Sequence, residues 1–299
     1  MRRQFYTLDV FTDLALSGNP LAVVLDAQGL DDARMQKIAQ EFNLSETVFV
    51  SDPTDPVNTA AIRIFTPARE LPFAGHPTVG TAALLAHLRA PDLLAAQDLR
   101  VVLEERVGDV VCVARHRKGK ALAAYFTSPR LPERREGSPS PETVAARLGL
   151  QPADIGFGAQ RLSTFGAGLD YLFAPIASIE ALERASPDLY RWGANGEPAI
   201  YLYAKQTAAS GSTYRARMFA AALGVREDPA TGSAAAAFAG VIMAFEPPPD
   251  GDTVITLEQG VEMGRRSLIA LGLDVEGGAL KSVTIGGSAV IVSEGALNL

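Results

Sequence analysis

Four polar side chains stand at breaks between apolar segments, where they could carry chemistry: Glu46, His76, Asp228 and Ser233. Glu46 lies in a short polar break, residues 43–47, that is followed at once by Val48-Phe49-Val50. Apolar surroundings raise the pKa of a carboxylic acid and suit it to general acid–base catalysis near neutral pH. The alternative is a glutamate at a helix end or strand edge that water solvates.

The other three side chains also have two interpretations each. His76 is the one histidine beside a Gly-Pro turn, so it could donate a hydrogen bond to an anion or shuttle a proton. Asp228, in the second half of the chain, is its candidate partner, or a turn residue that bonds nearby backbone. Ser233 could cap a helix, bind a ligand, or do both.

Other common catalytic patterns are missing from the sequence. The three histidines are scattered without metal-ligand spacing, and the single cysteine, Cys112, stands in an alternating valine-rich strand that predicts a core position. The residue after Ala234 is Ala235, so Ser233 is not in a Gly-x-Ser-x-Gly motif. The segment 156–161 lacks the third glycine of a dinucleotide loop, and we interpret its glycines as turns.

Two stretches of similar design must position these side chains. Residues 73–88 and 228–244 each run from a Gly-containing turn into a strongly apolar segment, which predicts a helix buried on most sides. Thr231, Gly232 and Ser233 are favourable cap and turn residues. The first N–H groups of a helix and its positive dipole end bind carboxylates and phosphates. The alternative is two ordinary capped core helices.

The remaining pattern predicts an α+β protein of two similar domains. Short strands alternate irregularly with helices over 31–42, 141–148 and 179–185, without the regular βαβ order of a doubly wound sheet. The best candidate linker is 127–141, which holds four prolines. We therefore predict domains at 1–127 and 128–299, with the last strands, about 283–299, packing back on the first domain.

Composition excludes several functions. The chain has 299 residues, 47% of them hydrophobic, and a net charge of −7, which argues against nucleic-acid binding. The basic run 115–120 predicts a solvated hairpin turn rather than a binding patch. No apolar stretch is long enough for a membrane span or signal core, so we expect a cytoplasmic protein without membrane or nucleic-acid partners.

Together these motifs resemble the PhzF family, the phenazine biosynthesis-like proteins of the diaminopimelate epimerase-like fold. The similarity covers nearly the whole chain, and the order of its motifs is what makes it specific. They are Ser17-Gly18-Asn19-Pro20, Asn43-Leu44-Ser45-Glu46-Thr47, Arg63-Ile64-Phe65-Thr66-Pro67, Gly75-His76-Pro77-Thr78, Glu227-Asp228-Pro229-Ala230-Thr231-Gly232-Ser233 and Glu258-Gln259-Gly260.

The resemblance implies that each domain is a curved, mostly antiparallel, barrel-like sheet around a central helix, with the active site in the interdomain cleft. It implies that Glu46 is the proton-transferring acid and base, and that His76 and Asp228 assist as catalytic residues. It also implies no cofactor, no metal and a homodimer. The residues that it assigns to substrate binding are Asn19, Ser45, Gly75, Gly232 and Ser233.

The resemblance also bears on the kind of proton transfer. Related racemases of this fold use one thiol from each domain, and alignment of the turns places those thiols at Ala74 and Thr231. Neither is cysteine, so a two-thiol racemase is excluded. We expect an isomerase acting on a small anionic substrate, an unsaturated or cyclic amino or hydroxy acid such as trans-2,3-dihydro-3-hydroxyanthranilate. Two alternatives are a non-catalytic metabolite-binding protein and an epimerase or lyase.

Overall fold

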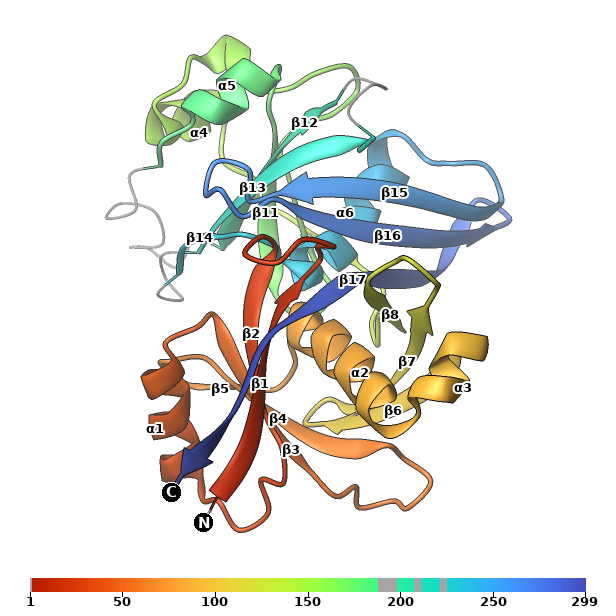
Figure 1. The fold of residues 1–299 in the computed structure, drawn as a ribbon. Helices are drawn as coiled ribbons and strands as arrows, with labels where there is room; N and C mark the ends of the chain where they lie inside the picture. Colours follow the sequence, from red (N-terminus) through yellow and green to blue (C-terminus); the bar gives the residue numbers. More distant parts are fainter. Residues whose placement is uncertain (1, 188–197, 207–210, 221–224) are drawn as a thin grey trace. The chain divides into compact units, whose positions relative to one another are not determined.

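The computed structural model describes residues 2–187, 198–206, 211–220 and 225–299. By their contacts these residues divide into two compact units, one of residues 1–127 and 286–299 and one of residues 128–285. We refer to them as unit 1 and unit 2, and each is drawn in Figure 1. That they are the two predicted domains stays a prediction.

Unit 1 is a sheet that closes on itself. Its ladder runs β17–β1–β2–β3–β4–β6–β7–β8 and returns to β17, which pairs with both β1 and β8. The β2–β3 and β4–β6 pairs are parallel, and the β17–β1, β1–β2, β3–β4, β6–β7 and β7–β8 pairs are antiparallel. The strands are β1 (Arg2–Val10), β2 (Asn19–Val24), β3 (Glu46–Ser51), β4 (Ala60–Phe65), β5 (Glu70–Leu71), β6 (Leu99–Glu105), β7 (Gly108–His116), β8 (Leu122–Thr127) and, from residue 286 on, β17 (Ala279–Asn298).

Helix α2 (Gly75–Arg89) lies inside the unit 1 sheet, in contact with strands β1, β2, β3, β6, β7 and β8 (Figure 1). It is apolar on nearly every side, and residues 75–86 are all buried. A helix without a polar face must be covered all round, which the closed sheet achieves. The other helices of unit 1 are α1 (Asp32–Phe42) and α3 (Pro91–Ala96).

Unit 2 repeats the same order of strand pairings. Its ladder runs β9–β10–β11–β12–β13–β15–β16, with parallel pairing at β11–β12 and β13–β15 and antiparallel pairing elsewhere. The strands are β9 (Glu133–Arg135), β10 (Ser163–Gly166), β11 (Asp170–Pro175), β12 (Ala199–Lys205), β13 (Tyr214–Ala220), β14 (Val225–Asp228), β15 (Gly251–Gln259) and β16 (Ser267–Glu276). The two stretches of similar design are therefore parts of one repeated topology.

Helix α6 (Gly232–Phe245) is the central helix of unit 2 and contacts β9, β10, β11 and β16. Phe238 is its main anchor, because its ring packs on Phe173, Tyr203 and Tyr214 with centroids 5.7, 4.7 and 5.3 Å apart. Aromatic pairs at such distances stabilise a core beyond the area that they bury. The anchor fixes the axial position of α6, and therefore the place of its first turn.

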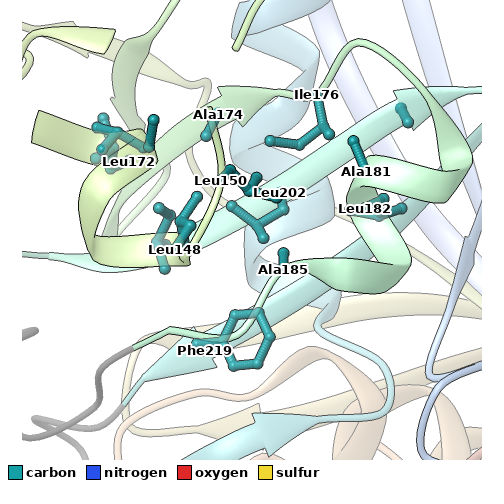
Figure 2. Packing of buried hydrophobic residues seen from close by; sticks show 14 residues of the cluster. Leu148, Leu150, Leu172, Ala174, Ile176, Ala181, Leu182, Ala185, Leu202 and Phe219 are labelled. Carbon is teal, nitrogen blue, oxygen red and sulfur yellow. The ribbon is translucent and has the colours of Figure 1, made fainter. Parts of the chain in front are cut away.

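Two further helices of unit 2 cover the sheet. Helices α4 (Pro141–Leu148) and α5 (Ile179–Arg184) bury a cluster against β11 and β12 that includes Leu148, Leu182 and Leu202 (Figure 2). Ser140 caps α4 and Gly149 ends it in the left-handed conformation, with φ of 67°. A short 3-10 turn, Pro152–Asp154, follows α4.

Several predicted elements differ in the structure. The sequence around 160–163 predicts a strand, but the strand in the structure is β10 at Ser163–Gly166, because Gln160 instead makes a turn bridge with Phe157. The polar break at 43–47 is shorter than expected, since parallel pairing with β2 begins the strand β3 at Glu46. The Thr231 side chain does not cap α6; its hydroxyl donates to Asp228 instead.

Gly240, in the middle of α6, lies against the ring of Phe165, where an added Cβ would be 2.4 Å from Cδ1. Overpacking costs about 1–3 kcal/mol, while alanine gains about 1 kcal/mol of helix propensity over glycine. We expect Gly240→Ala to lower the free energy of unfolding, measured by urea denaturation. Gly80→Ala in α2 is the comparison variant, because its added Cβ meets aliphatic methyl groups of Leu21 and Val10, at 2.6 and 2.8 Å, rather than an aromatic ring. A Gly240→Ala protein at least as stable as the comparison variant would contradict this packing.

Candidate active site

Glu46 is the first residue of β3, where it stands opposite Leu21 in the parallel pair with β2. Its side chain is 16% exposed. The carboxyl is therefore partly desolvated, which excludes the alternative of a fully solvated glutamate.

His76 meets Glu46 from helix α2. It is the second residue of the helix, and its ring is 5% exposed. Its Nε2 lies 3.4 Å from Oε2 of Glu46. Burial lowers the pKa of His76 to about 3, opposed in part by a hydrogen bond to the backbone of Pro20. The imidazole is consequently neutral at physiological pH, and the contact is not an ion pair.

The position of the ring proton follows from the Pro20 bond. Proline has no N–H, so the ring must donate to the Pro20 carbonyl. Nε2 has no hydrogen-bond partner among the described residues, so Nδ1 is the donor. The unprotonated Nε2 then faces the Glu46 carboxyl. Such a pair can share one proton, held by Glu46 and accepted by the lone pair of Nε2.

This arrangement predicts a specific nuclear magnetic resonance signature. In the ¹⁵N-histidine spectrum, His76 should stay neutral with its proton on Nδ1 from pH 8 to pH 5, because burial disfavours the imidazolium. His76→Gln identifies the signal. The folded pKa of His76 lies below its unfolded value, so the unfolded protein binds a proton first. The free energy of unfolding therefore falls as the pH falls from about 6.5 toward 3. A His76 signal that titrates near pH 6.5 would contradict the assignment.

The other predicted residues of unit 1 lie on the same elements. Asn19 is the first residue of β2 and is completely buried. Ser45 directly precedes β3 and is half-buried, and Gly75 begins α2. Asn19, Ser45, Glu46, Gly75 and His76 therefore all lie at the starts of β2, β3 and α2 in unit 1.

The predicted residues Asp228, Gly232 and Ser233 belong to unit 2, where they surround the start of α6. The Thr231 hydroxyl donates to Oδ2 of Asp228 at 2.6 Å. Gln259, the last residue of β15, donates through Nε2 to the Asp228 carbonyl at 2.7 Å and to the Thr231 hydroxyl at 3.0 Å. These bonds fix the turn that leads into the helix.

Two tyrosines stand near this turn, and the sequence interpretation did not include them. The Tyr171 and Ser233 hydroxyls are 2.8 Å apart. Burial raises the pKa of Tyr201, and the charge of Asp228 raises it further. The Tyr201 hydroxyl has no hydrogen-bond partner within the described part of the chain. Tyr201 therefore stays protonated, and its hydroxyl is a donor near Asp228.

An arginine–glutamate ion pair precedes each of the two turns that lead into α2 and α6. Arg63 on β4 bonds both carboxylate oxygens of Glu70, at 2.8 and 2.7 Å. Arg217 on β13 bonds both oxygens of Glu227, at 2.8 and 3.0 Å. Bidentate pairs of this kind restrict orientation as well as distance. The repeated Arg-x-Phe sequences at 63–65 and 217–219 were the signal that could have identified them.

The remaining candidates fall outside the site. Cys112 is buried, as predicted. Among the described residues no group of three or more His, Cys, Asp or Glu could hold a metal ion, and no helix is long and apolar enough to cross a membrane. In the basic run, Arg115 and Arg117 both pair with Asp98. A cavity of about 500 Å³ in unit 2 contains none of the predicted site residues; its lining is Arg134, Arg135, Glu136, Gly137, Ser138 and Leu162.

Comparison with known proteins agrees with these motifs. A family model described as phenazine biosynthesis-like protein matches residues 8–295. The chain is 46% identical to an uncharacterised isomerase of Mesorhizobium japonicum, over 99% of this chain and 98% of that protein. It is 35% identical to the trans-2,3-dihydro-3-hydroxyanthranilate isomerase of Pseudomonas aeruginosa, over 98% of each. A crystal structure of a PhzF family protein from Bacillus anthracis superimposes with a TM-score of 0.86 at 25% identity, over the full length of both chains.

Proposed function

Because the chain belongs to the phenazine biosynthesis-like (PhzF) family, we propose that it is an isomerase that moves a proton within a small carboxylate-bearing substrate, without a cofactor. The observation that carries the proposal is the buried pair of Glu46 and His76, with 3.4 Å between Oε2 and Nε2. A carboxyl beside an unprotonated ring nitrogen can both release and recover a proton. That is the requirement for general acid–base catalysis.

In the proposed reaction the Glu46 carboxylate takes a proton from an activated carbon of the substrate. The electron pair that is released needs a sink, which a conjugated double bond or carboxylate supplies. Protonated Glu46 can then donate to Nε2 of His76 while the intermediate forms, and it returns the proton to another carbon. No net proton is gained or lost, so atoms and charge balance.

The name of the Pseudomonas aeruginosa relative supplies the first substrate to test, trans-2,3-dihydro-3-hydroxyanthranilate. It carries a conjugated ring and a carboxylate, the two features that the proposed chemistry needs. A broader panel should contain other unsaturated or cyclic amino and hydroxy acids, because 35% identity does not fix a substrate. The roles of Asn19, Ser45 and Gly75 in binding, and the homodimer, stay predictions.

For unit 2 we propose that the start of α6 binds an anionic group. The amides of Gly232 and Ser233 stand at the helix N-terminus, where the helix dipole favours negative charge. The Tyr201 hydroxyl lies near Asp228 as a further donor. If the group is the substrate carboxylate, Ser233→Ala raises KM with little change in kcat, and Asp228→Asn lowers kcat.

The test offers the panel to the purified protein and follows both turnover and binding. Disappearance of the dihydroanthranilate spectrum, with a rearranged product in the ¹H spectrum, is the expected result. Binding measured by calorimetry without turnover would favour the metabolite-binding alternative instead. Exchange of a substrate proton with solvent, without rearrangement, would point to an epimerase or lyase.

A further inference from the structure

A second buried carboxyl, Glu105, lies against the first turn of α2 and has no part in the proton transfer proposed above. It is the last residue of β6 and is 8% exposed. Its Oε1 is 2.7 Å from the Thr78 hydroxyl oxygen, and its Oε2 has no partner among the described residues. The same Thr78 oxygen lies 2.8 Å from the carbonyl of Ala74, the residue that precedes Gly75 and His76.

The two contacts of Thr78 define where the protons are. The hydroxyl has one proton, and the Ala74 carbonyl can only accept a hydrogen bond. If Glu105 were ionised it too could only accept, and one of the two short contacts would join two oxygens with no proton between them. Both contacts are favourable when Glu105 is protonated and donates to Thr78, while Thr78 donates to Ala74.

The repeated topology supports this protonation state. In unit 1, Ala61 lies two residues before Arg63 and pairs with Glu104 on β6. In unit 2, Arg215 lies two residues before Arg217 and pairs with Glu258 on β15. Glu105 and Gln259 therefore occupy equivalent positions. Gln259 holds the turn of unit 2 through a neutral amide that donates to the Asp228 carbonyl and the Thr231 hydroxyl. A protonated carboxylic acid has the same shape and also donates, whereas a carboxylate does not.

Among the described residues, no ion pair offsets the burial of Glu105. Burial raises its pKa to about 8, and the Thr78 hydroxyl opposes this rise only in part. The nearest arginine in the chain, Arg106, pairs with Glu70 at 2.7 Å, as does Arg63 on β4. Two other buried titratable groups of unit 1 have shifted pKa values: burial and Glu105 raise the pKa of Cys112 on β7, and burial lowers the pKa of His76 on α2.

We propose that Glu105 is a positioning residue: its protonated carboxyl, acting through Thr78, holds the Ala74 carbonyl and thereby fixes the turn that carries Gly75 and His76. Ionisation removes the carboxyl donor, and the single Thr78 proton can then go to the Glu105 carboxylate or to the Ala74 carbonyl but not to both, so the turn loosens. The inference rests on the proposed role of His76, and it predicts that turnover falls as Glu105 ionises in mildly alkaline solution.

The kinetic test compares wild type, Glu105→Gln and Glu105→Leu with trans-2,3-dihydro-3-hydroxyanthranilate across pH 6 to 10. Wild-type kcat should fall about tenfold per pH unit above the ionisation of Glu105. Glu105→Gln, which reproduces the donor of Gln259, should keep most of its kcat and lose this alkaline fall. Glu105→Leu should lose up to about 10²-fold at every pH, because the turn is misplaced. A Gln variant that behaves like Leu, or that keeps the alkaline fall, would overturn the proposal.

A measurement without substrate separates this proposal from the isomerase assignment. The infrared difference spectrum between wild type and Glu105→Gln at pH 6.5 should show the carbonyl stretch of a protonated carboxylic acid, which disappears as the pH rises through about 8. The His76 ¹⁵N signals should shift over the same range in wild type and stay constant in the Gln variant. A carboxylate band at pH 6.5 would refute the proposal whether or not the protein turns over any substrate.

Discussion

Glu46→Gln is expected to lower kcat by about 10²–10⁴-fold, the usual contribution of a general acid–base group. The amide keeps the size of the side chain and its place at the start of β3, opposite Leu21. It cannot take a proton from carbon, and it cannot share one with Nε2 of His76. Because substrate binding does not need this proton, KM should change much less than kcat.

Glu41→Gln is the matched control for the loss of a carboxylate. Glu41 lies on α1 and is exposed, so the same substitution there removes one negative charge far from any buried partner. Its kcat should equal that of the wild type. If Glu46→Gln and Glu41→Gln have equal turnover, Glu46 is not the proton carrier.

Phe238→Ala is expected to lower the free energy of unfolding by about 3–5 kcal/mol, the range for removing a buried phenylalanine. Phe238 is fully buried on α6 between Phe173, Tyr203 and Tyr214. Small neighbouring helix residues cannot collapse into the space that the ring leaves. The urea unfolding midpoint measures the loss.

Phe245→Ala, at the last residue of the same helix, is the control for Phe238→Ala. Its ring is only partly buried and none of the ring contacts described for α6 involves it, so we expect a loss of about 1 kcal/mol or less. Equal losses for the two variants would show that the aromatic cluster does not anchor α6.

The sequence predicted the two central helices well, because their signals are local. A Gly-containing turn followed by a run of small and apolar residues specifies a helix with no polar face, and such a helix must lie inside a sheet. The predicted helix over 141–148, with Pro141 near its first position, has the bounds of α4 in the structure. The choice of Glu46 depended on its apolar neighbours in the chain; its side chain is 16% exposed, and its catalytic role stays a prediction.

What the sequence did not reveal depends on contacts between distant segments. The role of Glu105 follows from Thr78, 27 residues away, and from its equivalence with Gln259 in the other repeat. The repeated Leu-Glu-Glu at 103–105 and Leu-Glu-Gln at 257–259 was visible, but only strand pairing shows that these residues reach the central helices. The sequence predicts a final strand over 283–292, whereas β17 spans Ala279–Asn298, since its polar end becomes a strand by pairing with β1.

The most direct test of the central claim is deuterium incorporation into the product. Wild type and Glu46→Gln are each given trans-2,3-dihydro-3-hydroxyanthranilate in D₂O, and the product is read carbon by carbon in the ¹H and ²H spectra. We predict deuterium at one carbon with the wild type, since the Glu46 proton exchanges with solvent between turnovers, and almost none with the variant in the same time. Equal incorporation by both proteins at the same carbon would contradict proton transfer through Glu46.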